Sequence, residues 1–108
     1  MSAPEIHTTT QKFTVNIDPE LQEIVPSFLE NRQKDVETIR ESMATRDYKT
    51  IQRIGHIMKG AGGGYGFDRI TELGSSLEKA AQAEDFKKIE GDLGELVRYL
   101  GGIEIKYQ

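Results

Sequence analysis

Apolar residues recur at alternating steps of three and four positions along most of this chain, a spacing typical of amphipathic helices. The first long series contains Val25, Phe28, Leu29, Arg32, Val36, Ile39 and Met43. The second series contains Ile51, Ile54, Met58, Ala61 and Tyr65. The third contains Ile70, Leu73, Leu77 and Ala80 or Ala81. The fourth contains Phe86, Ile89, Leu93, Leu96, Leu100 and Ile103. The pattern predicts four helices and no competing strand.

Residues that favour helix starts mark the boundaries between these series. Aspartates that can cap or open a helix stand at Asp18, Asp47, Asp68 and Asp85. Pro19 suits a first helical position, so we predict a short extra helix from there to about Val25 and a restart at Pro26. Short connections force neighbouring helices to pack antiparallel. We therefore expect an all-α, up-down-up-down four-helix bundle over residues 18–108, preceded by a partly extended or mobile tail over residues 1–17.

Glycines crowd the end of the second long helix. Gly60, Gly62, Gly63 and Gly64 each cost about 1 kcal/mol relative to alanine inside a helix. Packing of the bundle can offset this cost, and we expect the helix to continue to about Tyr65. The alternative is a helix that ends near Gly62 and a glycine loop after it.

Composition excludes several classes of function. With 108 residues the chain has room for one domain, and it contains no cysteine for a disulfide or a thiolate metal site. A formal charge of −4, with charges of both signs, provides no basic stripe for nucleic acid. No segment resembles a signal peptide or a membrane span, so we expect no membrane partner and a cytoplasmic location.

Metal and nucleotide sites are not supported either. His7 lies in a threonine-rich tail and is expected to be incidental, and two distant histidines without cysteines make poor metal ligands. The glycines at 62–66 lack the lysine of a nucleotide loop and follow a helix rather than a strand. The scattered carboxylates are expected to belong to solvated faces: Glu72, Glu78, Glu84, Asp85 and Glu90.

The remaining histidine lies opposite the apolar stripe of its helix. At about 100° per residue, His56 points away from the core side of residues 51–65. Several residues share its outward side, and these are Gln52, Arg53, Lys59, Gly60 and Gly63. Ile57 lies at the edge of the core face, where an exposed apolar side chain can help to dock a partner. We take Gln52, Arg53 and Ile57 as candidate docking residues.

This face suits phosphoryl transfer. A neutral imidazole is a competent nucleophile near physiological pH. Lys59 provides a mobile positive charge for phosphoryl oxygens. Gly60 and Gly63 leave room for the in-line approach of a donor and an acceptor.

The segment resembles the signature of the histidine phosphotransfer (HPt) family, in which a histidine is followed by two residues, Lys-Gly, five more residues and a second glycine. Here the matching residues are His56, Lys59, Gly60 and Gly66, and the resemblance extends over about residues 18–100. It implies that His56 accepts the phosphoryl group, that Lys59 steadies it and that Gly60 admits the partner. It also implies that the partner is a receiver domain that carries the aspartyl phosphate and Mg²⁺, so that the chain itself needs no metal or cofactor.

The resemblance further implies that Nε2 reacts while Nδ1 is held by an acceptor, for which Gln52 is a candidate. We interpret the chain as a phosphocarrier and not an autonomous enzyme, and we expect a monomer. Two alternatives stay open: a helical adaptor of the same fold that is never phosphorylated, and the substrate domain of a larger histidine kinase. Transfer from charged receivers separates the first alternative from the phosphocarrier.

Overall fold

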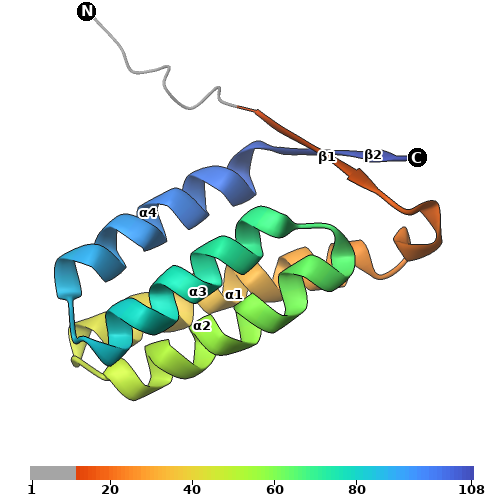
Figure 1. Ribbon diagram of the computed structural model, residues 1–108. Coiled ribbons are helices and arrows are strands. Elements are labelled where there is room, and N and C mark those ends of the chain that lie inside the picture. Colours follow the sequence, from red (N-terminus) through yellow and green to blue (C-terminus); the bar gives the residue numbers. More distant parts are fainter. Residues whose placement is uncertain (1–11) are drawn as a thin grey trace, which may run out of the picture.

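Four helices make up most of the computed structural model, which describes residues 12–108 (Figure 1). They are α1 (Val25–Ala44), α2 (Tyr48–Gly62), α3 (Asp68–Gln82) and α4 (Phe86–Gly102). Helices that follow one another in the chain pack together, and α1 also packs against α4. The predicted up-down-up-down four-helix bundle is confirmed. No helix in residues 12–108 has the length and apolarity that a bilayer crossing requires.

The bundle core is formed by the apolar positions that the sequence pattern identified. Each helix contributes buried side chains at spacings of three or four residues, which places them on one face. The buried members of the four series are Val25, Phe28, Arg32, Val36, Ile39, Ile51, Ile54, Met58, Ile70, Leu73, Leu77, Ala80, Ala81, Ile89, Leu93 and Leu96.

Aspartate caps fix the starts of two helices. The Asp47 carboxylate accepts a hydrogen bond from the Thr50 backbone N–H at 3.2 Å, and Asp85 accepts one from Lys88 N–H at 3.1 Å. Such caps satisfy backbone donors that have no partner inside the helix. The predicted extra N-terminal helix is wrong in extent, because only a single 3₁₀ turn, η2 (Pro19–Leu21), forms there.

Two short strands correct the all-α prediction. Strand β1 (Phe13–Ile17) pairs in parallel with β2 (Ile103–Tyr107), with Phe13 opposite Ile103. The last helix therefore ends at Gly102, and Ile103 begins a strand instead of completing the helical series. Figure 1 shows this sheet at one end of the bundle. Strand β1 runs toward residues 18–24, where the chain reverses direction into α1. Helix α4 runs antiparallel to α1 and therefore in the same direction as β1. Because β2 continues from α4, it pairs with β1 in parallel.

The sheet is part of the packed structure. Ile17 is only 1% exposed, and the rings of Phe13 and Tyr99 lie 5.1 Å apart between centroids. Residues 13–17, which we assigned to a tail, therefore pack on the bundle. The predictions for residues 1–11, including the mobile part of the tail and the incidental role of His7, lie outside the described residues.

The glycine-rich end of α2 remains helical but changes from an α-helix to a 3₁₀ helix. Helix α2 ends at Gly62 and continues as the 3₁₀ turn η3 (Gly63–Tyr65), so the expected helical course to about Tyr65 is confirmed. Gly66 then adopts a φ of 89°, a left-handed conformation that glycine tolerates best. The Phe67 N–H donates to the Gly62 carbonyl at 2.9 Å, which closes the helix end.

Candidate functional site

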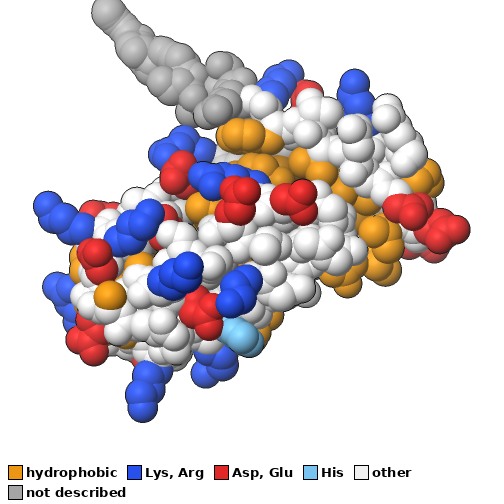
Figure 2. Space-filling view, viewed as in Figure 1, with side chains coloured by type: hydrophobic (Ala, Val, Ile, Leu, Met, Phe, Trp, Pro, Cys, Tyr) orange, Lys and Arg blue, Asp and Glu red, His pale blue; other side chains and the backbone are white. Residues whose placement is uncertain are grey.

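Helix α2 presents His56 to solvent. Its inward face is anchored by Ile51 and Met58, each 0% exposed, whereas the His56 side chain is 68% exposed. This is the outward direction that the helical spacing predicted. Figure 2 shows a histidine on the surface with basic and acidic side chains beside it.

Glycines bring α3 unusually close to the backbone of α2 beside this histidine. A Cβ atom placed on Gly74 would lie 2.5 Å from the Lys59 backbone nitrogen and 2.7 Å from the Gly55 carbonyl oxygen. A Cβ on Gly55 would lie 2.7 Å from the Glu78 backbone nitrogen. Real Cβ atoms do not approach backbone atoms so closely, so both positions require glycine. The close approach places residue 78 of α3 next to the histidine.

The Glu78 carboxylate contacts both His56 and Lys59. Its Oε2 lies 3.0 Å from the His56 Nδ1, and its Oε1 lies 3.2 Å from the Lys59 Nζ. The Glu78 side chain is 15% exposed, much less than the Lys59 side chain at 44%. The expectation that Glu78 belongs to a solvated face is therefore wrong. One half-buried carboxylate links the nucleophile and the cation of the predicted site.

The electrostatics keep Glu78 ionised. The hydrogen bond from Lys59 lowers the pKa of Glu78 below its usual value, and His56 contributes in the same direction, while partial burial opposes the shift. An ionised carboxylate can only accept hydrogen bonds, so the Nδ1 of His56 must donate in this contact. The neutral imidazole then carries its proton on Nδ1 and a lone pair on Nε2.

The other predicted site residues lie on α2 and the turn that follows it, and most of them are exposed. Arg53, Gly60 and Gly63 are exposed, and a Cβ on Gly60 would meet no atom within 4 Å. Ile57 is 50% exposed, although it is a large apolar residue, and Gln52 is half-buried. Gln52 is not the acceptor for Nδ1, because Glu78 occupies that role.

One sequence signal could have identified Glu78. Gly74 and Glu78 are four residues apart and share a face of α3, and Gly55 directly precedes His56 on α2. A glycine in each helix at this level indicates a close helix crossing, which brings the residue one turn after Gly74 to the histidine. That reading needs the pairing of α2 with α3 in addition to the spacing within either helix.

Within residues 12–108, no three histidine, aspartate or glutamate side chains are grouped as metal ligands. The chemistry that the described residues offer is a nucleophilic imidazole nitrogen, a nearby ammonium group and open space over Gly60.

Comparison with known proteins gives one result. The family model described as "Hpt domain" matches residues 23–103, a range that contains all four bundle helices in full. No curated protein and no solved structure matches the chain.

Proposed function

We propose that His56 is the residue that accepts and donates the phosphoryl group in this chain, which belongs to the Hpt domain family. Hpt domains are histidine phosphocarriers of phosphorelays and interact with receiver domains, and they are generally not enzymes by themselves. The assignment to His56, and the roles of the residues around it, are our own inferences. The observation that carries them is the exposed imidazole whose Nδ1 is held by Glu78 at 3.0 Å.

The contact with Glu78 supports attack by Nε2. In the proposed step, the Nε2 lone pair forms the bond to phosphorus while the bond between phosphorus and the receiver's aspartate oxygen breaks. The electron pair of the broken bond leaves with the aspartate carboxylate, and the proton on Nδ1 stays in place. The imidazole ring gains positive charge as the new bond forms, and the Glu78 carboxylate stabilises that charge.

Lys59 can bind the phosphoryl group as this group reaches His56. Its Nζ contacts the Glu78 carboxylate, which also holds His56. Because the Lys59 side chain is 44% exposed, it is free to turn outward. As negative charge builds up on the phosphoryl oxygens, the Lys59 ammonium group can leave the Glu78 carboxylate and bind these oxygens instead. Phosphorylation would then loosen the contact between Lys59 and Glu78 and leave Glu78 to the imidazole.

The surface around His56 suits a receiver domain. The open space over Gly60 admits the partner's active site, and the exposed Ile57 offers apolar contact area. Arg53, also exposed, can complement the acidic pocket in which a receiver holds its aspartate and Mg²⁺. Gly63 and Gln52 extend the same face, and we propose all five as contacts of the docked receiver.

The test of this function is transfer from a phosphorylated receiver. A receiver charged with acetyl phosphate should pass its label to this chain, and the label should be acid-labile and base-stable, as a phosphorus–nitrogen bond requires. An unlabelled chain after incubation with a panel of charged receivers would favour the adaptor that only docks partners.

Replacing Lys59 with alanine should slow this transfer about tenfold without abolishing it, since the lysine stabilises charge that develops during transfer. The measurement is the single-turnover rate from a charged receiver. Lys34→Ala, which removes an exposed lysine from α1, is the matched control and should leave the rate unchanged. Equal rates for the two variants would remove Lys59 from the proposed site.

Replacing Glu78 with alanine should disturb the imidazole itself, because Glu78 acts as a positioning residue. In the wild type, nitrogen NMR should show the neutral ring of His56 protonated on Nδ1, and in Glu78→Ala the ring should shift toward the Nε2-protonated form that free imidazoles favour. Transfer should slow by about tenfold or more. Glu72→Ala, on the same helix, is the control. A ring tautomer unaffected by Glu78→Ala would refute this role.

A further inference from the structure

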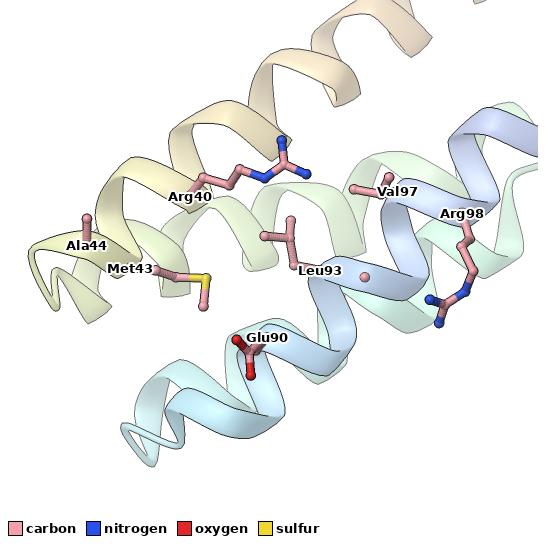
Figure 3. A pocket seen from close by; sticks show the side chains of 8 residues that line it. Arg40, Met43, Ala44, Glu90, Leu93, Val97 and Arg98 are labelled. Carbon is pink, nitrogen blue, oxygen red and sulfur yellow. The ribbon is translucent and has the colours of Figure 1, made fainter. Parts of the chain in front are cut away.

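An apolar groove lies between α1 and α4, away from the proposed phosphotransfer site. The groove is open to solvent and has a volume of about 580 Å³. Met43 from α1 and Leu93 and Val97 from α4 supply its apolar surface, and Val97 is 38% exposed (Figure 3). Leu93 is otherwise buried in the core, so Val97 is the exposed large apolar side chain of this groove, and such exposure is typical of interaction surfaces.

The groove is independent of the phosphotransfer chemistry. His56 and Glu78 belong to α2 and α3, whereas the residues that line the groove belong to α1 and α4. A partner in the groove would therefore leave the histidine accessible to a receiver. The proposed function gives this surface no role.

Three charged residues line the groove, and two of them, Glu90 and Arg98 on α4, are spaced so that they can pair with the same residues of a second copy. Glu90 lies four residues before Gly94 on α4, and Arg98 lies four residues after it, so the two charges are about one turn on either side of that glycine. A second α4 packed antiparallel, with the two-fold axis at Gly94, brings Glu90 level with Arg98 of the copy, and the reverse pair forms by symmetry. Both side chains are exposed, and within residues 12–108 neither forms an ion pair.

Gly94 itself fits the close approach of another helix. A Cβ placed there would meet only the flexible tip of Arg98, at 3.7 Å, so nothing within the monomer requires glycine at this position. Gly74, by contrast, is required by the backbone of α2. A glycine at the centre of an exposed helix face allows a second helix backbone to come near.

From the groove, its self-complementary charges and the glycine at their centre, we propose that two copies of this chain associate through α4, with Val97 of each copy entering the groove of the other. The sequence alone led us to expect a monomer. The apolar surface that the groove exposes is small, so the dimer should be weak and detectable only at high protein concentration.

Sedimentation velocity between about 5 µM and about 1 mM tests the proposal, because this range brackets a weak dimer. Arg98→Glu and Glu90→Arg each replace two attractive contacts per dimer with two repulsive ones, and each should weaken association by about tenfold or more. The double variant Glu90→Arg/Arg98→Glu restores opposite charges and should return the dissociation constant to within about threefold of the wild type. Lys49→Glu, which changes the charge on α2 by the same amount and in the same direction as Arg98→Glu does on α4, is the control and should have no effect.

The outcomes separate clearly. A wild-type chain that stays monomeric throughout this concentration range overturns the proposal. A dimer that both single variants leave intact places the interface elsewhere and also overturns it. Circular dichroism of each variant shows whether a loss of association reflects unfolding. Phosphotransfer to His56 should be unaffected in the double variant, so failure here is distinguishable from failure of the proposed function.

Discussion

Replacing His56 with glutamine is expected to abolish phosphorylation of the chain while leaving the fold intact. The glutamine side chain keeps a polar group on the same exposed face but lacks a nitrogen lone pair that can attack phosphorus. Because the His56 side chain is 68% exposed, the free energy of unfolding should change by less than about 0.5 kcal/mol. The measurements are incorporation of labelled phosphate from a charged receiver and a urea melt of the same sample.

A control separates this expectation from a general loss of docking. Gln52→Ala changes a neighbouring half-buried residue on the proposed docking face and should still permit phosphorylation, at a reduced rate. Label that persists on a folded His56→Gln protein would contradict the assignment and would point to another nucleophile.

Replacing Gly74 with alanine is expected to lower the stability of the bundle by about 2 kcal/mol and to slow phosphotransfer at the same time. The added Cβ would lie 2.5 Å from the Lys59 backbone nitrogen, so α2 and α3 must move apart. That movement breaks the 3.0 Å contact between Glu78 and Nδ1 of His56. Chemical denaturation and the single-turnover transfer rate measure the two effects.

The same substitution at Gly91 is the matched control. Gly91 lies inside α4, and a Cβ placed there would meet no atom within 4 Å. Gly91→Ala should therefore raise the free energy of unfolding by about 1 kcal/mol, because alanine is the better helix former. If both variants shift stability in the same direction, the close crossing of α2 and α3 does not govern the fold as we describe it.

The amphipathic pattern was sufficient to predict the bundle and the outward direction of His56. Helical spacing depends on residues within a few turns, so the stripe containing Ile51 and Met58 fixes the opposite face without knowledge of the rest of the chain. Aspartate caps such as Asp47 and Asp85 are local signals too, and they mark the helix starts that the structure shows.

Features that depend on distant partners could not be predicted in this way. The alternating residues 103–107 carry a strand signal, but Ile103 also fits the helical series after Leu96 and Leu100, and only pairing with residues 13–17 decides between the two. Glu78 was missed for a similar reason. Its contact with His56 depends on how closely α3 approaches α2, which Gly55 and Gly74 set together.

The most direct test of the central claim is long-range proton–nitrogen NMR of the phosphorylated chain, which distinguishes the two ring nitrogens of a phosphohistidine. We predict a single phosphohistidine, at His56, with phosphorus on Nε2 and the proton retained on Nδ1. Phosphorus found on Nδ1 of His56, or on His7 instead, would contradict the account.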